Sequence, residues 1–538
     1  MQSPEDMSVN AQSISANGAQ GNLGILPIGL QFFPELVEEG YVYVDKTEHV
    51  YRMTHLGSKY VFLSRPRRFG KTLLCSTMEA YFQGRKDLFG GTAMATLERD
   101  WEAHEVLMLS MNRCKGPSAE VVGMEIANML ASLERRYGIQ KDASVTLGGR
   151  LSNIIEAAYE RSGKRVVVII DEYDAPLLDV LHDEAALREV RSAMKSFYEV
   201  LKPADRYLRF VFMTGVTKFA QLSLFSAFNN INNISMDVEF ADICGITPEE
   251  IERQLLPHVD RLALSLGTDR DGALAELKRL YDGYHFTLPS PDIYNPFSLV
   301  CALSKRQLKS FWFGTGTPTF LIEMMRKFGT DPTTLSSVRA KEADFDQSTD
   351  TLETIVPLMY QSGYLTIKSY DADRGQYSLG IPNREVHDGL MESLARLYVG
   401  NALSDVHDTL ADIRLSLKRN DMDGALRLIR DFLKTVPYAN VKNQEGHYQQ
   451  MLYIIFSLLG AYVDLEVRTA KGRIDVVMST QRRLFLLELK LDKSADAAMG
   501  QIDLMDDPAR FANAGLPVTK VGVNFSTEER TITDWVIE

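Results

Sequence analysis

One short segment limits the choice of fold more than any other, because the run Val166–Ile170 contains only β-branched apolar residues. Strands of that composition occur where both faces of a parallel sheet are covered by other apolar groups. The run ends in the acidic residues Asp171, Glu172 and Asp174. Functional groups of such sheets gather at the carboxyl ends of the strands, so this acidic end predicts a ligand site in an α/β domain.

A second motif lies nearer the N-terminus, in the segment Ser64–Thr72. It follows a short apolar run that predicts a strand at Tyr60–Leu63, and it precedes an apolar-periodic stretch that predicts a helix over Leu73–Phe82. A strand, a loop ending in Gly-Lys-Thr and a helix make up a phosphate-binding P-loop. In that arrangement backbone N–H groups cradle the phosphates, Lys71 reaches the β- and γ-phosphates, and Thr72 reaches Mg²⁺.

The loop departs from the usual P-loop pattern at its first glycine, whose place is taken by Arg65. A Cβ at that point hinders a tight turn. We expect the three arginines of the loop, Arg65, Arg67 and Arg68, to supply phosphate contacts in exchange. Gly70 keeps its usual place before Lys71. A cationic turn before a helix, without a ligand, is the alternative interpretation.

The acidic strand end provides the other parts of an ATP site. Asp171 is expected beside Mg²⁺, and Glu172 is expected to polarise the attacking water, with Asp174 as the next candidate for that role. A third strand is predicted over Leu208–Met213, and Thr214 at its end is expected to sense the γ-phosphate. A solvated strand end is the alternative interpretation of the acidic residues.

A separate group of polar residues lies near the C-terminus, on two predicted neighbouring strands. Asp475 belongs to the first, and the apolar run Leu484–Leu487 of the second leads into Glu488 and Lys490. Side chains alternate along a strand, so Glu488 and Lys490 share a face. The carboxylates would hold Mg²⁺, and the lysine would lie beside the attacking water or the scissile phosphate. An exposed pair on a sheet edge is the alternative.

This arrangement resembles the PD-(D/E)xK nuclease superfamily, with Asp475 as the metal-binding Asp and Glu488-Leu489-Lys490 as the ExK element. The superfamily core has the order helix, three strands, helix, which matches the predicted elements here. The resemblance implies further metal ligands in the first helix and first strand and a supporting polar residue in the last helix. The matching residues are, in chain order, Glu445, Glu466, Asp475, Glu488, Lys490 and Gln501.

Short segments elsewhere extend the resemblance to most of the chain. The chain resembles a family of uncharacterised bacterial proteins with an AAA-ATPase-like N-terminal domain and a C-terminal PD-(D/E)xK nuclease domain. In that family the Arg-Pro-Arg-Arg-Phe-Gly-Lys form of the P-loop is usual, and the resemblance implies ATP binding and nuclease chemistry. The segments are Leu26–Gly29, Tyr41–Thr47, Ser64–Thr72, Tyr281–Tyr284, Tyr294–Phe297, Thr315–Phe320 and Gln361–Tyr364.

These motifs predict an α/β fold class for both ends of the chain: a P-loop NTPase-type parallel sheet, and a C-terminal restriction-endonuclease-like α/β domain. A helical lid, opened by Thr247 as N-cap, and a winged-helix-like middle region are expected between them. The expected parts are a disordered tail at 1–24, an AAA-ATPase-like domain at 25–240, the lid at 241–345, a winged-helix-like and helical connector at 346–439, and the nuclease domain at 440–538.

The composition of the chain limits where in the cell the protein is expected and how strongly it can bind nucleic acid. The 538 residues contain no apolar run long enough to span a bilayer, and the N-terminal tail lacks the features of a signal peptide, so we expect a cytoplasmic protein without membrane contact. The net charge is −13, and residues 440–538 hold 11 Lys and Arg against 14 Asp and Glu. Affinity for bare nucleic acid should therefore be modest and sensitive to salt.

Several single residues have two interpretations. His285 is expected to be a packed polar residue of the lid rather than a base, and His447 a neutral surface histidine rather than a contact to DNA phosphate. Arg306, Lys309 and Arg326 are the candidates for an arginine finger acting on the nucleotide of a neighbouring subunit, if the chain forms a homo-oligomer.

The sequence thus predicts an ATP-binding, ATP-hydrolysing protein whose nucleotide state gates Mg²⁺-dependent cleavage of nucleic acid, with DNA preferred over RNA. The alternative is a nucleotide-dependent switch whose C-terminal domain binds nucleic acid without cutting it.

Overall fold

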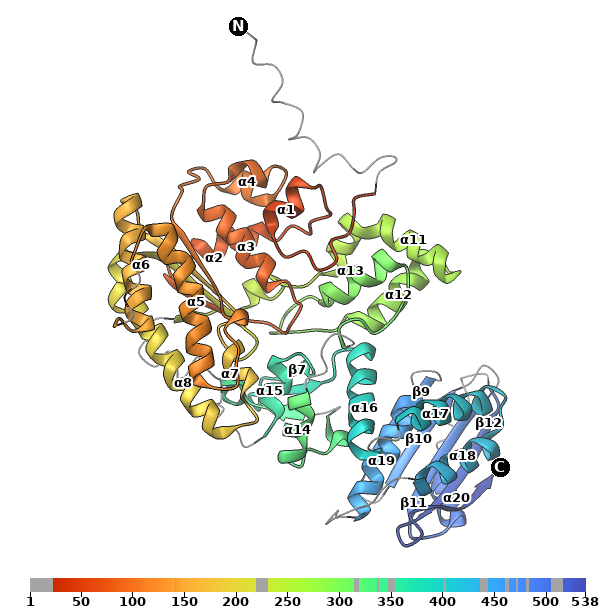
Figure 1. Cartoon of the computed structure of the whole chain (residues 1–538). Helices are drawn as coiled ribbons and strands as arrows, with labels where there is room; N and C mark the ends of the chain where they lie inside the picture. Colours follow the sequence, from red (N-terminus) through yellow and green to blue (C-terminus); the bar gives the residue numbers. More distant parts are fainter. Residues whose placement is uncertain are drawn as a thin grey trace. The chain divides into compact units, whose positions relative to one another are not determined.

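The computed structural model describes residues 23–140, 142, 144–218, 231–313, 319–335, 338–346, 354–399, 403–435, 444–459, 464–470, 473–479, 483–504 and 516–538. Contacts divide the chain into two compact units, each with its own hydrophobic core (Figure 1). The first unit is Met1–Phe328 with Ser337–Glu385, and the second is Gly329–Ser336 with Val386–Glu538. Helix α16 (Arg384–Val399) spans this division, since its first two residues belong to the first unit.

The first unit is built on a parallel five-stranded sheet. Its order is β2 (Val106–Ser110), β3 (Val166–Asp171), β4 (Leu208–Gly215), β1 (Tyr60–Ser64) and β5 (Ile231–Asn233). The three strands predicted from the sequence in this region are β1, β3 and β4, and all three are present. Every residue of β3 is buried, as its β-branched composition requires. All neighbouring strands of this sheet are parallel, as the predicted P-loop NTPase-type fold requires.

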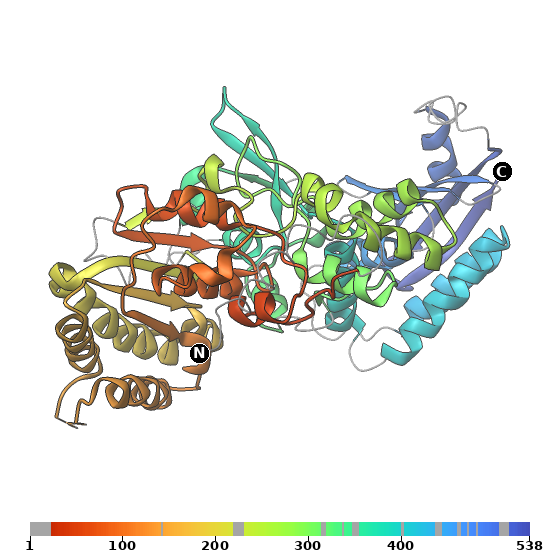
Figure 2. The same cartoon turned by 90° about the horizontal axis from the view of Figure 1, so that it is seen from above.

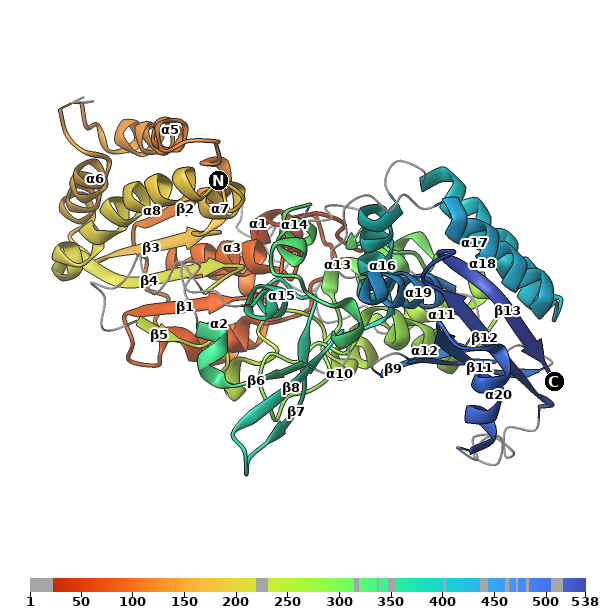
Figure 3. The same ribbon diagram turned by 90° about the horizontal axis from the view of Figure 1, so that it is seen from below.

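Helices cover both faces of this sheet. One face contacts α5 (Ala119–Tyr137), α6 (Leu147–Ser162) and α8 (Glu184–Tyr198), which lie together in Figure 3. The P-loop helix α3 (Lys71–Phe82) contacts β3 and β2, and its residues are not part of that shared core. Shorter helices of this unit are α1 (Phe33–Glu38), α2 (Thr47–Thr54), α4 (Ala93–Leu97), α7 (Ala175–Asp179) and α14 (Thr319–Lys327).

The helix that the sequence predicts after Thr247 begins at that residue. Thr247 caps α10 (Pro248–Glu250) in a capping box: its hydroxyl accepts a hydrogen bond from the Glu250 N–H, and the Glu250 carboxylate accepts one from the Thr247 N–H. The chain continues through a π-helical turn into further helices that share a core with Leu26. These are α11 (Leu256–Leu266), α12 (Arg270–Tyr281) and α13 (Pro296–Lys305).

The middle region contains the predicted helix and hairpin. Helix α15 (Val356–Gln361) precedes strands β7 (Thr366–Asp371) and β8 (Gln376–Gly380), which pair in antiparallel fashion. A third strand, β6 (Val338–Ala340), pairs with the other side of β8. It was not predicted, because three residues are too few to show an alternating pattern.

The second unit contains a mixed five-stranded sheet. Strands β11 and β12 are parallel to each other, and the three remaining pairs of neighbouring strands are antiparallel. The strand order is β13 (Thr531–Ile537), β12 (Val518–Ser526), β11 (Leu484–Leu491), β10 (Arg473–Ser479) and β9 (Asp464–Ala470). The sequence predicts β9, β10 and β11 as three successive strands, and the structure agrees.

Helices lie on both faces of this sheet as well. One face packs against α17 (Leu403–Lys418), α18 (Met422–Thr435) and α19 (Gln444–Leu459). Figure 2 shows the cyan helices of this set along one side of the blue strands. The other face contacts α20 (Ala495–Leu504), the last predicted helix. None of the helices in the described ranges is long and apolar enough to cross a membrane.

A glycine sets how closely α20 approaches the sheet. Gly522 of β12 is the register partner of Glu488 in β11. A Cβ at Gly522 would lie 2.4 Å from the carbonyl oxygen of Ala495 and 2.9 Å from the backbone nitrogen of Met499. Both atoms belong to the backbone of α20, so they cannot move aside unless the helix moves. The missing side chain therefore allows α20 to lie directly over Glu488.

We predict that Gly522→Ala destabilises this part of the chain by about 1–3 kcal/mol, the usual cost of overpacking. Gly500→Ala is the matched control, because a Cβ at Gly500 of the same helix would meet no atom within 4 Å. It should be neutral or stabilising by about 0.5–1 kcal/mol through helix propensity. Hydrogen exchange of β11–β13 reports the difference, and equal protection in both variants would contradict the packing argument.

Candidate functional site

The P-loop closes around the ammonium group of Lys71. Gly70 has a φ of +91°, a left-handed conformation that suits glycine, and it is the N-cap of α3. Lys71 Nζ donates hydrogen bonds to the carbonyl oxygens of Arg65 (3.0 Å) and Pro66 (2.9 Å), and the side chain is buried. The N-terminus of a twelve-residue helix and a buried cation thus meet at one point. A phosphate is the ligand that such a point favours.

The end of β3 lies against the first turn of α3. Thr72 Oγ1 donates to Asp171 Oδ2 at 2.7 Å, and Asp171 is 4 % exposed. The second oxygen of Asp171 has no hydrogen-bond partner among the described residues. Burial raises the pKa of Asp171, against the opposing effects of the Thr72 hydroxyl and the Lys71 charge. An unpaired carboxylate oxygen beside a hydroxyl fits the oxygen-ligand preference of Mg²⁺.

The two other acidic residues of this strand end have different surroundings. Glu172 has a φ of +52° and lines the cavity described below. Asp174 is 1 % exposed and accepts hydrogen bonds from the Thr217 N–H and hydroxyl (both 2.6 Å) and from the Val216 N–H. The prediction of Asp174 as a second candidate for water activation is therefore wrong, because its oxygens hold the loop after β4.

Thr214 lies between the P-loop strand and the acidic strand, since β4 separates β1 from β3. Its side chain is fully buried, and its hydroxyl has no partner in the described part of the chain. The next residue is a glycine for a steric reason: a Cβ at Gly215 would lie 2.5 Å from Asp174 Oδ1. A buried hydroxyl at this place is compatible with the predicted sensor, whose role stays a prediction.

A cavity of about 550 Å³ opens over the P-loop, within the size range of ligand pockets. Its apolar lining comes from the segments 26–44, 243–255 and 296–300, and its polar lining from the P-loop and the ends of β2 and β3. Glu172 is the one acidic residue among the described lining residues, against five cations. Such a cavity suits an anion that carries an apolar group. The cations are Lys46, Arg67, Arg68, Lys71 and Lys115.

Arg65 does not face this cavity, so the prediction that it contacts phosphate is wrong. Its side chain is 1 % exposed and turns away from the loop into the protein. The guanidinium carbon lies 4.2 Å from the ring centroid of Phe286. Burial lowers the pKa of Arg65, and the carbonyl dipoles compensate its charge. The guanidinium donates to the carbonyl oxygens of Ser64, Ser235, Phe240 and Ala241.

The other two arginines of the loop are exposed and line the cavity. The Arg68 guanidinium lies 4.2 Å from the ring centroid of Phe297 in α13, and the Arg67 carbonyl accepts a hydrogen bond from the Trp312 indole (3.0 Å). The backbone N–H of Trp312 in turn donates to Glu385, in the first turn of α16. These contacts leave the Arg67 guanidinium available for the predicted phosphate contact.

Segments that carried the family resemblance surround the P-loop. Phe69 makes edge contacts with Tyr284 (ring centroids 4.8 Å apart) and Phe286 (5.5 Å). Gly363 lies so close to Pro66 that an added Cβ would stand 2.8 Å from the proline ring. The loop is thus held from the lid and from the hairpin region. Sequence reasoning noted these segments but could not assign them this role, because the contacts join distant parts of the chain.

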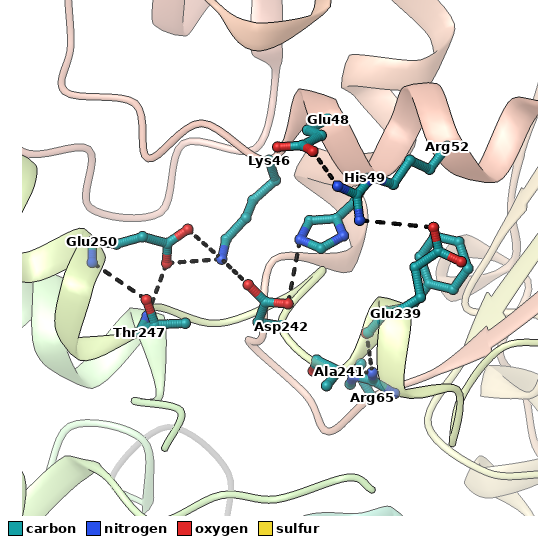
Figure 4. A network of polar contacts seen from close by, with 11 residues as sticks. Lys46, Glu48, His49, Arg52, Arg65, Glu239, Ala241, Asp242, Thr247 and Glu250 are labelled. Atoms are coloured by element: carbon teal, nitrogen blue, oxygen red, sulfur yellow. Dashed lines mark hydrogen bonds and ion pairs between the residues drawn. The ribbon is translucent and has the colours of Figure 1, made fainter. Parts of the chain in front are cut away.

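A partly buried ion-pair network joins α2 to the start of the lid (Figure 4). Lys46 Nζ lies 2.6 Å from Glu250 and 3.9 Å from Asp242, and His49 Nε2 lies 3.3 Å from Asp242. Although burial opposes it, the hydrogen bond and charge of His49 and the charge of Lys46 hold the pKa of Asp242 down at about 2. The charge of Lys46 is therefore neutralised within the protein, although this residue lines the cavity.

In the second unit, three of the predicted nuclease residues come together. Lys490 Nζ donates to Glu488 Oε1 at 2.8 Å and to Gln501 Oε1 at 3.4 Å. The Lys490 and Glu488 side chains are 11 % and 4 % exposed. Strand β11 provides two of these groups and helix α20 the third. Neighbouring buried groups of opposite charge on an otherwise apolar strand are the arrangement that the ExK pattern predicts.

The remaining predicted metal ligands are located by their backbones alone. Asp475 is the direct register partner of Glu488 in the antiparallel pair β10–β11, and Glu466 is paired with Val477. Glu445 lies in the first turn of α19. The side chains of Asp475, Glu466 and Glu445 lie outside the described residues. Among the side chains that are described, no group of three or more His, Cys, Asp or Glu is placed to hold a metal ion.

The remaining single residues of the sequence analysis are His285, His447 and the candidates for an arginine finger. His285 lies 3.2 Å from Asp292 and 2.8 Å from the Ser290 hydroxyl, as a packed polar residue of the lid. Arg306 ends α13 with a φ of +52°. The side chains of Arg326 and His447 lie outside the described residues. Assignment of an arginine finger stays a prediction.

Comparison with known proteins adds two family matches. Residues 27–225 match a model described as a predicted AAA-ATPase, and residues 443–535 match the PD-(D/E)XK nuclease superfamily. A curated relative is an uncharacterised protein encoded in the vnfD 5′ region of Azotobacter chroococcum mcd 1. The two chains are 34 % identical over 532 residues, which is 95 % of this chain and 98 % of the relative.

Two solved structures show distant similarity. The Aeropyrum pernix ORC1 protein, solved in complex with DNA, is 10 % identical with a TM-score of 0.24, and Cdc6p from Pyrobaculum aerophilum is 11 % identical with a TM-score of 0.21. Each match covers 72 % of this chain and 98 % of the other. At these TM-scores nothing follows from the match.

The buried contacts of Arg65 lead to a prediction about stability. Arg65→Lys should lower the free energy of unfolding by about 2 kcal/mol or more, because a lysine cannot satisfy the same carbonyl oxygens and hydrogen bonds to charged groups are each worth about 1.5–3 kcal/mol. Arg67→Lys is the control, since that side chain is exposed, and it should change stability by less than about 0.5 kcal/mol.

Thermal unfolding of both variants measures the difference. An Arg65→Lys variant as stable as the wild type, but weaker in nucleotide binding, would show that the guanidinium acts on a ligand instead.

Proposed function

Because the chain belongs to the family of AAA-ATPase-like proteins that carry a C-terminal PD-(D/E)XK nuclease domain, we propose that it binds and hydrolyses ATP with Mg²⁺ and uses its nucleotide state to gate cleavage of nucleic acid. The observation that carries the ATP half is the contact of Thr72 with Asp171 beside Lys71, at the N-terminus of α3. These groups line or adjoin a cavity whose described lining is strongly cationic.

The residues of the P-loop have separate tasks in this proposal. The backbone N–H groups at the start of α3 bind phosphate oxygens, and Lys71 exchanges its loop carbonyls for the β- and γ-phosphates. Thr72 and Asp171 would hold Mg²⁺, which neutralises phosphate charge when it is bound. Glu172 orients and polarises the attacking water, and its carboxylate takes the proton. The apolar lining from the segments 26–44 and 296–300 receives the base.

The nuclease half rests on the second unit. Glu488 and the register position of Asp475 bring two acidic residues opposite each other on neighbouring strands. Lys490 lies beside Glu488 and is placed to bind the scissile phosphate or the attacking water. Gln501 supports the lysine from α20. The substrate is nucleic acid, with DNA preferred over RNA, and the net charge of residues 440–538 makes its binding weak and dependent on salt.

Two substitutions test the ATP half. Lys71→Ala should lose nucleotide affinity, because it removes charge-assisted contacts to phosphate. Glu172→Gln should bind ATP normally but hydrolyse it about 10²- to 10⁴-fold more slowly, because an amide is a poor proton acceptor. Equilibrium binding and phosphate release measure the two effects. Normal hydrolysis by Glu172→Gln would assign water activation to another residue, and tight binding by Lys71→Ala would remove the P-loop from the site.

A second set of substitutions tests the nuclease half. Asp475→Ala and Glu488→Gln should abolish metal-dependent cleavage, and Lys490→Ala should lose most activity while metal binding persists. Glutamine is chosen at Glu488 because it keeps a hydrogen-bond acceptor for the buried Lys490. Glu529→Ala, in the exposed turn before β13, is the control and should cut normally. The assay uses linear, circular and single-stranded DNA and RNA with Mg²⁺ or Mn²⁺.

The outcome separates the two candidate functions. Cleavage by Asp475→Ala at the wild-type rate would refute the assignment of the site. Binding of nucleic acid by the wild-type protein without cleavage of any substrate would favour the alternative, a nucleotide-dependent switch that does not cut.

The same assay with and without ATP tests gating. A shift of a two-state equilibrium from 1:99 to 99:1 requires about 5.5 kcal/mol of differential affinity, which contacts to the γ-phosphate can supply. Cleavage by the full chain should therefore depend on ATP, and Glu172→Gln should hold the enzyme at one extreme, constantly active or constantly silent. Equal rates under all conditions would mean that the two units act independently.

A further inference from the structure

Lys115 is a cation of the nucleotide cavity that the sequence motifs do not include. It lines the cavity together with Asn112 and Glu172, and it comes from the loop that follows β2. The strand pairs with β3 so that Ser110 is the register partner of Asp171. The loop therefore starts beside the acidic strand end, on the side of β3 that lies away from the P-loop strand β1.

The backbone on both sides of Lys115 is fixed. Cys114 is fully buried, and its N–H donates to the Met111 carbonyl in a 3₁₀ turn. Gly116 is buried against Val121, and a Cβ there would stand 2.5 Å from the valine side chain. The loop then ends at Ser118, the N-cap of α5. A half-buried lysine held between two buried neighbours has its Cα at a defined place, and only its flexible side chain can adjust.

The ammonium group of Lys115 has no acceptor within the described ranges. No hydrogen bond, ion pair or ring contact joins Lys115 to another described residue, in contrast to three of the other lining cations. Lys46 is paired with Glu250, Lys71 is bound by the P-loop carbonyls, and Arg68 stacks on Phe297. A cation that lines a ligand cavity without a partner among the described residues is placed to meet an anionic ligand.

We propose that Lys115 contacts the γ-phosphate of ATP from within the same chain. The inference rests on the proposed ATP function and adds a residue to it. Lys115 and Glu172 line the same cavity and follow the neighbouring strands β2 and β3, whereas the P-loop cations follow β1 on the far side of β4. In this proposal the lysine therefore approaches the phosphate from the side at which water attacks. Many nucleotide sites receive this charge as an arginine finger from another subunit or protein. Here Lys115 provides it in cis and lets the site distinguish ATP from ADP.

The test compares the affinities of the full chain for a non-hydrolysable ATP analogue and for ADP, each with Mg²⁺, by calorimetry. Lys115→Gln removes the charge and keeps a polar side chain that is one atom shorter. It should bind the ATP analogue about 10-fold or more weakly, the value of one charge-assisted contact, while ADP affinity stays within about 2-fold. Lys115→Arg keeps the charge and should retain most of the preference.

Arg113→Ala is the matched control, because Arg113 lies two residues away, carries the same charge and is exposed outside the cavity lining. It should change neither affinity. If Lys115→Gln loses the same affinity for both nucleotides, the lysine contacts the inner phosphates or acts through its charge in general. If the variant loses no affinity for either nucleotide, the lysine is not part of the site. Either result overturns the inference while the ATP proposal stands. A wild-type chain that binds neither nucleotide would overturn both.

Discussion

The buried guanidinium of Arg65 is the interaction on which the nucleotide unit depends. A charge removed from water is costly unless hydrogen bonds replace its hydration. Here the replacement comes from backbone carbonyls of β1, of the segment after β5 and of the turn that leads into the lid. The same side chain stacks on Phe286. One residue thus fixes the end of the P-loop strand against two segments that lie 170 or more positions away in the sequence.

Much of the fold could be predicted because it depends on local patterns. The β-branched run of β3, the capping residue Thr247 and the ExK pattern of β11 each carry their own signal, and each element is where the sequence placed it. The contact of Thr72 with Asp171 follows from a motif whose two halves must meet. Gln501 reaches Lys490 because the order of strands and helices fixes which face α20 covers.

What could not be predicted depends on contacts between distant residues. An arginine in a phosphate loop suggests a phosphate contact, and nothing local shows that Arg65 turns inward. Asp174 has the residue type of a catalytic base, but the loop after β4 occupies its oxygens. Lys115 belongs to no motif, and only the fold shows that it lines the same cavity as Glu172. The net charge of the chain also does not predict the charge of the site, for a similar reason. The whole chain carries −13, yet the described lining of the cavity is cationic.

Helix α16 has a mechanical property that follows from its position in the chain. Its first turn is held by Glu385, which accepts hydrogen bonds from the Trp312 N–H and the Ser298 hydroxyl, so it is tied to the P-loop through the Trp312 indole. The remainder of its 16 residues belongs to the other compact unit. Any displacement of the Arg67 carbonyl would therefore reach the first turn of α16 through one tryptophan and one carboxylate, those of Trp312 and Glu385.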